Sequence, residues 1–267
     1  MSKTIAIIGG GNLGLSIVEG LTAGGFLSPG QITITRRNTT LLQPYQQQGM
    51  AITNDNAAAA AGADVILLAV KPFQIREVIR EIAPSLTAEK LLISVVTGVS
   101  TQEMRSELLE DKIPAIFRAM PNTAVAIRES MTCLSHSKAT EDQVNWVLEL
   151  FSQVGRVVII DEKLMDAATV LGACGTAYAM RYIRANIQGG IEIGFDAKTA
   201  SLIAAQTVKG AAELLLQKGT HPEYEIDKVT TPKGCTIAGL NEMEHQGFSS
   251  SLIKGISASY VKIQADK

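Results

Sequence analysis

The hydrophobic positions of the chain follow one pattern before residue 160 and another after it. In the first part, short and nearly continuous runs of Val, Ile and Leu alternate with amphipathic stretches. Such runs are typical of strands buried on both faces of a sheet, and their alternation with helices predicts parallel strands joined by crossover helices. We expect strands at Thr4–Ile8, Ile32–Thr35, Val65–Val70, Leu91–Val96, Ala115–Arg118, Met131–Ser135 and Arg156–Ile160. The expected helices are Leu15–Ala23, Thr40–Gln47, Gln74–Ile82, Thr101–Leu109 and Glu141–Ser152.

After Asp161 the pattern changes to long, alanine-rich segments with apolar residues at helical spacing, and no strand pattern remains. The expected helices are Leu164–Ile193, Asp196–Gln217, Tyr224–Val229, Cys235–His245 and Ser249–Ala265. These segments are too apolar for an isolated helical unit, and small residues at Gln188–Gly190 and Ala204–Ala205 would allow close packing against a second copy. We therefore expect a homodimer or higher homo-oligomer through this region. A monomer with a compact helical cap is the alternative.

A glycine motif stands between the first expected strand and the helix that follows it. Gly9, Gly11 and Gly14 form Gly-x-Gly-x-x-Gly, with Asn12 and Leu13 at the variable positions before the last glycine. In this setting the first glycine makes a tight turn, the second leaves room for a pyrophosphate, and the third allows close packing of helix on strand. The N–H groups at the start of the helix would hold the phosphates. A glycine-rich turn that binds nothing is the alternative.

Together, the patterns predict an α/β fold. An N-terminal, doubly wound Rossmann-type parallel sheet would occupy residues 1–160, and an all-helical C-terminal dimerisation domain would occupy residues 161–267. The hinge between them would be short, near Ile160–Lys163.

The residues after the second expected strand bear on the choice of coenzyme. An NAD-binding domain usually places an acid there for the ribose hydroxyls, whereas this chain has Arg36 and Arg37 followed by Asn38 and Thr39. An acid would repel a 2′-phosphate, and guanidinium groups bind one well. We expect NADP(H), with NAD(H) less favoured; two arginines on a solvated turn are the alternative.

Composition and charge narrow the classes of partner. The formal net charge is −2, so neither nucleic acid nor a membrane surface is expected as a partner. The apolar segment 196–216 carries charged side chains, which predicts a buried helix and not a membrane span. The cysteines Cys133, Cys174 and Cys235 have no metal-ligand spacing with the three histidines, so no metal is expected. Sparse cysteines and a start at Met1–Lys3 without secretory character predict a cytoplasmic protein.

Four further motifs stand at Leu68–Pro72, Arg118–Thr123, Gly172–Tyr178 and Thr231–Ile237, the last preceded by His221–Pro222. Taken singly, each could be a strand end, a turn or a helix cap. Taken together with the glycine motif, their order and spacing resemble those of pyrroline-5-carboxylate reductase across essentially the whole chain.

The resemblance implies the roles of individual residues. Ala69, Val70, Lys71 and Pro72 would line the ribose and nicotinamide side of the coenzyme cleft, Met120, Pro121, Asn122 and Thr123 would close its floor towards the substrate, and Asn56 would contact the adenosine end. The Thr231–Thr236 loop, with Lys233, Gly234 and Cys235, would bind the substrate carboxylate through backbone N–H groups. This loop would come from the partner subunit, and Cys174 would lie in the other substrate loop. Thr236 would be the catalytic residue, its hydroxyl facing the imine nitrogen.

The chemistry implied is the NADPH-dependent reduction of 1-pyrroline-5-carboxylate to L-proline, the last step of proline biosynthesis. Reducing a C=N bond needs a hydride donor held about 3–3.5 Å from the imine carbon. A strong side-chain acid is not needed, because the imine nitrogen is basic enough to take a proton from water. The lack of an obvious acid–base pair is therefore compatible with imine reduction.

The chain also departs from the family's usual residues. Gly172–Thr176 stands where Ser-Gly-Ser-x-Pro is usual, Lys233 replaces a glycine, Ala124 a proline and Ser130 a glycine. A lysine at 233 either reshapes the loop, because positive φ is costly for it, or adds a cation for the carboxylate. The alternatives left open are a related imine reductase, a β-hydroxyacid-dehydrogenase-like enzyme with Arg181 in the place of its lysine, and a non-catalytic NADP-binding homologue.

Overall fold

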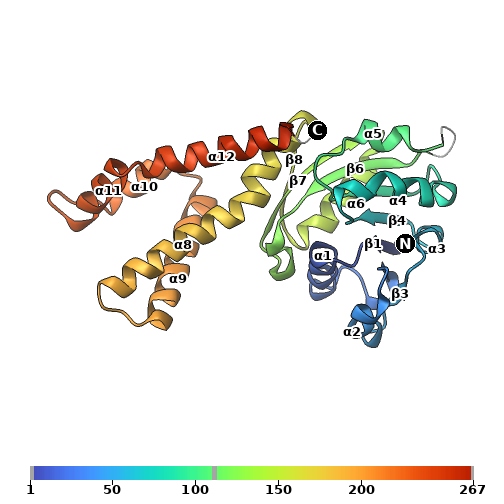
Figure 1. The fold of residues 1–267 in the computed structure, drawn as a ribbon, viewed down its shortest axis with the longest axis horizontal. Coiled ribbons are helices and arrows are strands. Elements are labelled where there is room, and N and C mark those ends of the chain that lie inside the picture. Colours follow the sequence, from blue (N-terminus) through green and yellow to red (C-terminus); the bar gives the residue numbers. More distant parts are fainter. Residues whose placement is uncertain (1–2, 110–112, 266–267) are drawn as a thin grey trace. The chain divides into compact units, whose positions relative to one another are not determined.

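The structure, a computed structural model, describes residues 3–109 and 113–265 (Figure 1). The chain divides into two compact units: the first holds the chain up to Ala173 and its end from Ile263, and the second holds Cys174–Lys262. Residues 161–173 thus pack with the first unit, although the sequence places the domain boundary at residue 160; that domain boundary stays a prediction. Residues 1 and 267, the outer limits of the two expected domains, lie outside the described residues. Residues 1 and 2 of the Met1–Lys3 start, which the sequence predicts to be non-secretory, lie outside them as well.

The first unit is built on one eight-stranded sheet with the order β3-β2-β1-β4-β5-β6-β7-β8. Neighbouring strands run parallel, with the exception of the antiparallel pair β6 and β7. The strands are β1 (Ile5–Ile8), β2 (Ile32–Thr35), β3 (Ala51–Thr53), β4 (Val65–Leu68), β5 (Leu91–Ser94), β6 (Ala115–Met120), β7 (Ser130–Ser137) and β8 (Gly155–Ile159). The strand order reverses between β1 and β4, which is the place where doubly wound sheets bind ligands.

Helices cover both faces of this sheet and enclose two separate cores. On one face, Ile7 of β1 packs with Val18 and Phe151; on the other, Ile66 of β4 packs with Ile79. Strands β1 and β4 are buried at every position, as their continuous apolar runs predict. The helices of this unit are α1 (Asn12–Ala23), α2 (Gln43–Gln47), α3 (Asn56–Ala61), α4 (Ile75–Ile82), α5 (Thr101–Ser106), α6 (Glu141–Ser152) and α7 (Met165–Ala168). Short 3-10 helices lie at Pro29–Gln31, Thr39–Leu42, Pro72–Gln74, Ala83–Ser85, Thr123–Ile127 and Glu162–Leu164, and a π-helix at Thr169–Cys174.

The structure confirms the expected α/β fold and corrects it in two places. The sequence prediction misses β3 and α3, because β3 is a three-residue edge strand without a buried position and α3 is an alanine run with no amphipathic pattern. The expected parallel sheet is wrong at β7. The link from β6 to β7 contains only the 3-10 turn Thr123–Ile127, which is too short for the crossover that a parallel pair needs.

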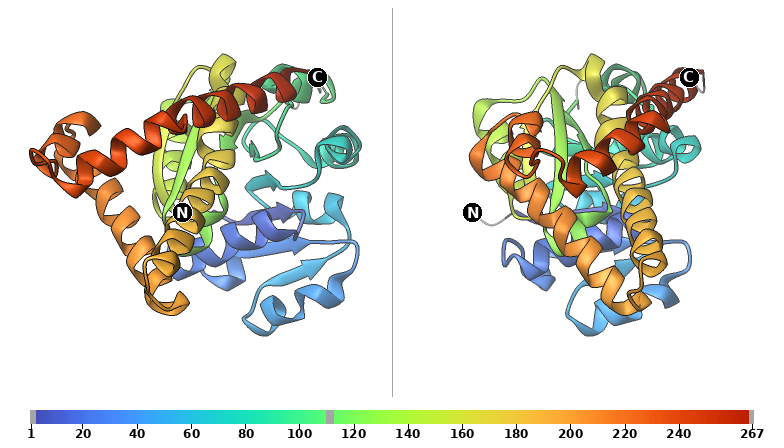
Figure 2. Two further views of the ribbon diagram at one scale, coloured as in Figure 1. Left: turned by 60° about the vertical axis from the view of Figure 1, so that its left-hand side comes forward. Right: turned by 90° about the vertical axis from the view of Figure 1, so that its left-hand side faces the viewer.

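The second unit is helical throughout its described length. It consists of α8 (Gly175–Glu192), α9 (Ala197–Lys218), α10 (Pro222–Lys228), α11 (Cys235–His245) and most of α12 (Phe248–Ala265). Helices α8 and α9 pack side by side as a hairpin (Figure 2). The Cβ of Ala200 lies 3.1 Å from the position that a Cβ would take on Gly190. Among the described helices, none is long and apolar enough to cross a membrane.

An apolar groove runs along the α8–α9 hairpin. It has a volume of about 500 Å³, and its lining includes the exposed side chains of Ile193, Phe195 and Ile203. Exposed apolar surface of this kind marks a protein interaction site, in agreement with the expected oligomer.

Candidate functional site

The glycine-rich loop joins β1 to α1 in the conformation that dinucleotide binding requires. Gly9 has φ +112°, and a Cβ there would lie 2.6 Å from the carbonyl oxygen of Ala69. A Cβ on Gly14 would lie 2.3 Å from the carbonyl oxygen of Gly9, so helix and strand approach too closely for any side chain. A Cβ on Gly11 would meet no atom within 4 Å. The first and third glycines are therefore needed by the fold, and the second leaves open space.

The start of α1 behind this loop offers free hydrogen-bond donors. Gly11 is the N-cap, no side chain caps the helix, and no acidic residue stands in its first turn. Within the described part of the chain, the backbone N–H groups of Asn12 and Leu13 have no acceptor. Open space at Gly11 and free N–H groups at the positive end of the helix dipole fit a pyrophosphate.

The two arginines at the end of β2 lie in different environments. Arg36 is half-buried, and its Nη1 donates to the carbonyl oxygen of Gly10 at 2.7 Å. Arg37 is exposed to solvent. The structure therefore separates two residues that the sequence presents as one pair.

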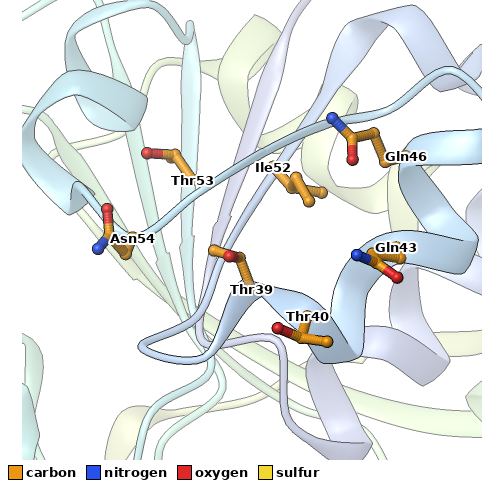
Figure 3. Close-up of a pocket in the computed structure, with 7 residues that line it drawn as sticks. All are labelled: Thr39, Thr40, Gln43, Gln46, Ile52, Thr53 and Asn54. Atoms are coloured by element: carbon orange, nitrogen blue, oxygen red, sulfur yellow. The ribbon is translucent and has the colours of Figure 1, made fainter.

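A hollow of about 440 Å³ lies beside this turn (Figure 3). It is lined by Thr39, Thr40, Gln43, Gln46, Ile52, Thr53 and Asn54, so hydroxyl and amide groups surround it and no carboxylate does. Sequence reasoning noted the threonine after the arginines but missed the rest of this lining, because β3 was not predicted.

Asn56 stands at the start of α3, beside the end of β2. Its Oδ1 accepts the hydroxyl of Thr35 at 2.6 Å, and its Nδ2 donates to Oε2 of Glu81 at 2.9 Å. These two bonds fix the amide plane at the carboxyl edge of β2. Asn56 is thus placed next to the arginine turn, and its contact with the adenosine end stays a prediction.

The segment after β4 borders the glycine-rich loop. Ala69 donates its N–H to the carbonyl of Ile8 at 2.8 Å, and its own carbonyl faces Gly9. Val70 is half-buried, whereas Lys71 and Pro72 are exposed at the start of the following 3-10 helix. The expected cleft residues therefore lie at the point where the strand order reverses.

The residues after β6 form a firmly held turn. Met120 and Pro121 are buried. Asn122 accepts from the N–H of Ala124 at 3.0 Å through Oδ1 and donates from Nδ2 to the carbonyl of Gly172 at 3.2 Å. Its backbone N–H donates to Oγ of Ser130 at 3.1 Å. The side chain of Asn122 thus connects this turn to the Thr169–Cys174 π-helix, and the serine that replaces a usual glycine supports the turn.

A buried ion pair holds the strand that carries this turn. Arg118 is 5% exposed, and its Nη1 lies 3.1 Å from Oε1 of Glu162. Glu162 also accepts from the backbone N–H and the hydroxyl of Thr101, at 2.7 and 2.6 Å. Sequence reasoning missed Glu162, because its partners lie 44 and 61 residues away and leave no local pattern.

The motif Gly172–Tyr178 lies within a continuous helical stretch and is not a helix cap. It starts in the π-helix and continues into α8, with Cys174 half-buried at the junction. π-Helical turns are frequent at functional sites. Tyr178 is half-buried, and its hydroxyl hydrogen-bonds to that of Ser259 at 2.6 Å.

The Thr231–Thr236 motif of the second unit forms a turn in front of α11. The N–H of Gly234 donates to the carbonyl of Thr231 at 2.9 Å, and Lys233 has φ +59°. Gly234 is the N-cap of α11, without a side-chain cap and without an acidic residue in the first turn. A Cβ on Gly234 would lie 2.5 Å from Oγ1 of Thr231. The loop therefore keeps a left-handed residue at 233 although that residue is lysine.

The cysteines and the metal-ligating residues add no second site. Burial raises the pKa of the Cys133 thiol, which disfavours the thiolate, and the three cysteines are free. No cluster of His, Cys, Asp and Glu in the described ranges could hold a metal ion.

These features define a class: a two-domain oxidoreductase that binds a nicotinamide dinucleotide. Residues 4–98 match the family model of NADP oxidoreductases described as coenzyme F420-dependent, and residues 162–265 match the pyrroline-5-carboxylate reductase dimerisation model. Pyrroline-5-carboxylate reductase 2 of Dictyostelium discoideum is 42% identical over 98% of this chain and 92% of its own length. The chain belongs to the pyrroline-5-carboxylate reductase family.

Two further comparisons agree with this family assignment. Pyrroline-5-carboxylate reductase 1 of Dictyostelium discoideum is 45% identical over 96% of this chain, which spans only 48% of that relative's length. The crystal structure of the Plasmodium falciparum pyrroline carboxylate reductase with NADP bound superimposes with a TM-score of 0.87, at 25% identity and over 98% of this chain and 97% of that one.

Proposed function

We propose that this protein reduces 1-pyrroline-5-carboxylate to L-proline with NADPH as the hydride donor. Membership of the family and the fit of the glycine-rich loop to a dinucleotide support this activity. The assignment of an imino-acid substrate is supported by one observation on the loop in front of α11. The Thr231–Gly234 turn retains positive φ at Lys233 and leaves the start of α11 uncapped, so the loop keeps an anion-binding shape despite its unusual residue.

The residues of the first unit would hold and orient the coenzyme. The N–H groups of Asn12 and Leu13 would bind the pyrophosphate, with Gly11 leaving the room that the phosphates occupy. The segment Ala69–Pro72 would line the ribose and nicotinamide side, and Asn56 the adenosine end. Met120 and Pro121 would form the floor, and Asn122 would fix it through its bonds to Ala124 and Gly172.

The residues of the second unit would hold the substrate. Its carboxylate would accept from the N–H groups of Cys235 and Thr236 at the positive end of α11, and the ammonium group of Lys233 would add attraction. The Thr236 hydroxyl would hydrogen-bond to the imine nitrogen and orient the C=N bond for hydride transfer. Cys174 would border the substrate from the other loop.

A homodimer or higher oligomer is proposed. The partner copy would supply the Thr231–Thr236 loop, and the apolar α8–α9 surface would be covered.

The free thiols and sparse cysteines support a reducing compartment, and we propose a cytoplasmic location on that basis.

The first test is coenzyme consumption with 1-pyrroline-5-carboxylate, run with NADPH and with NADH, beside a panel of hydroxyacids with NADP⁺. Proline formation with a preference for NADPH is the expected result. Oxidation of hydroxyacids without imine reduction would replace the proposal with the dehydrogenase alternative. Tight NADPH binding without turnover of either substrate class would replace it with a non-catalytic homologue.

The role of Thr236 has its own test. Thr236→Val removes the hydroxyl, and losing a hydrogen bond to a charged group such as the protonated imine costs about 1.5–3 kcal/mol, which is about a ten- to hundredfold loss of turnover. NADPH binding should not change, and Thr236→Ser should restore most of the turnover. Unchanged turnover in the valine variant would show that the role assignment is wrong.

A further inference from the structure

We propose that Arg36 and Arg37 have separate tasks. Arg36 is a positioning residue that holds the glycine-rich loop for any nicotinamide dinucleotide, and Arg37 alone gives the preference for NADPH over NADH. The inference rests on the proposed coenzyme and deepens it, because it states which side chain recognises the 2′-phosphate.

The contacts of Arg36 tie it to the loop in front of α1. Its Nη1 donates to the carbonyl of Gly10 at 2.7 Å, and the N–H of Gly10 donates to the carbonyl of Thr35, also at 2.7 Å. Both backbone polar groups of Gly10 are therefore bound to the end of β2. The N–H of Arg36 is itself fixed, since it donates to the carbonyl of Thr53 at 3.1 Å.

Gly10 has little freedom to move once these bonds are made. A Cβ at this position would lie 2.9 Å from Cδ2 of Leu42 and 3.1 Å from Cγ2 of Ile34, so apolar side chains press against it. Gly10 stands between Gly9 and Gly11, whose positions decide where the pyrophosphate can lie. Both NADPH and NADH carry that pyrophosphate, so an arginine that acts through Gly10 affects both coenzymes alike.

Arg37 differs from Arg36 in its exposure and in its contacts. It is exposed, and in the part of the chain that the structure describes its guanidinium has no carboxylate or carbonyl partner. The neighbouring side chain of Asn38 is already engaged, because its Oδ1 accepts from the N–H of Thr40 at 3.1 Å. The polar hollow of Figure 3 begins two residues further along the chain, at Thr39 and Thr40, and its lining includes no carboxylate. A guanidinium without a described partner at this turn suits a phosphate dianion, which it can bind through two parallel hydrogen bonds.

The experiment compares Arg37→Ala with Arg36→Met in binding assays on the full-length protein. Calorimetry measures the Kd of NADPH, of NADH, and of the fragments adenosine 2′,5′-bisphosphate and 5′-AMP. Arg37→Ala should weaken NADPH and the bisphosphate by about ten- to hundredfold, the usual loss for a charged hydrogen bond, and change NADH less than about twofold. Arg36→Met should weaken NADPH and NADH by the same factor and leave their ratio unchanged.

A selective loss of NADPH in Arg36→Met, or an unchanged ratio in Arg37→Ala, would overturn the proposal. If Arg36→Met does not fold by circular dichroism, Arg36→Lys replaces it. The lysine keeps the charge but not the planar donor group, so it should still weaken both coenzymes equally, and a selective loss of NADPH would again refute the assignment. Wild-type turnover of the imine is measured separately. A failure of the proposed activity would therefore leave the ratio of coenzyme affinities as an independent result.

Discussion

The buried pair of Arg118 and Glu162 gives a stability prediction whose size follows from its surroundings. The Arg118 side chain is 6% exposed and that of Glu162 is 31% exposed. Glu162→Ala would leave the guanidinium without its carboxylate, and Nε of Arg118 already has no hydrogen-bond partner among the residues that the structure describes. It would also leave the N–H and hydroxyl of Thr101 without their acceptor at the start of α5.

The expected loss in the free energy of unfolding is about 2–4 kcal/mol. Breaking a fully buried ion pair costs about 3–5 kcal/mol, and the partial exposure of Glu162 lowers that figure because water already solvates part of its charge. Arg118→Met should cost less, about 1–2 kcal/mol, since Glu162 keeps its two bonds to Thr101. The double variant should lose less than the sum of the single losses, by at least about 0.5 kcal/mol, because it contains no unpaired buried charge.

Urea unfolding of the three variants, read as midpoint and slope, measures these losses. Arg80→Met is the matched control. Arg80 lies 2.6 Å from Glu107, closer than Arg118 lies to Glu162, but the Arg80 side chain is 66% exposed. Glu107 is only 10% exposed, but it keeps a second arginine, Arg76, at 3.5 Å when Arg80 is removed. A pair with one partner in solvent contributes at most about 1 kcal/mol, so the shorter contact should be the weaker one. If Glu162→Ala costs no more than Arg80→Met, or if the double variant is additive, then burial does not decide the strength of the pair.

Three further results are expected. Gly11→Ala should leave the thermal midpoint nearly unchanged and weaken NADPH binding about tenfold or more. Gly14→Ala should destabilise the protein, because its Cβ would lie 2.3 Å from a carbonyl oxygen. Equal stability of the two variants would contradict this. Lys233→Gly should stabilise the protein by up to about 1 kcal/mol by relieving the positive φ, and raise the KM of the imino acid most at low salt, as kinetics at two ionic strengths would test. Hydrogen bonds from Thr4 lower the pKa of Asp64, so its ionised form adds stability above the ordinary pKa of aspartate, and that stability is lost as the pH falls through the lowered value. Asp64→Asn should therefore be less stable at neutral pH and converge with the wild type in acid unfolding; an equal deficit at every pH would refute the linkage.

Local patterns were enough to predict most of the fold. Continuous apolar runs identified the buried strands β1, β4 and β5, and amphipathic spacing identified α6 at its observed bounds, Glu141–Ser152. The elements that were missed carry no such pattern, since β3 has three residues and α3 has the sequence Asn-Ala-Ala-Ala-Ala-Ala. The direction of β7 depends on the length of its connection, which periodicity does not report.

The residues of the candidate site also divide into those that a local sequence pattern predicts and those that it does not. The glycine motif and the motif after β6 were visible because their residues are neighbours in sequence. The supports of these motifs were not, because they join distant segments: Arg36 to Gly10, Asn122 to Gly172 and Glu162 to Thr101. A sequence shows which residue types are present, but the partner of each long side chain is decided by which strands become neighbours in the sheet.

Two of the departures from the usual family residues add side-chain chemistry to their loops. Lys233 takes the left-handed conformation that the replaced glycine would adopt at less cost. Ser130 is buried, and its hydroxyl accepts the N–H of Asn122, so the new side chain supports the turn after β6. What is new is therefore a charge in one loop and a hydrogen bond in the other. An effect of Lys233 on substrate affinity should depend on ionic strength, as a charge effect does, and an effect that is the same at every salt concentration would contradict this reasoning.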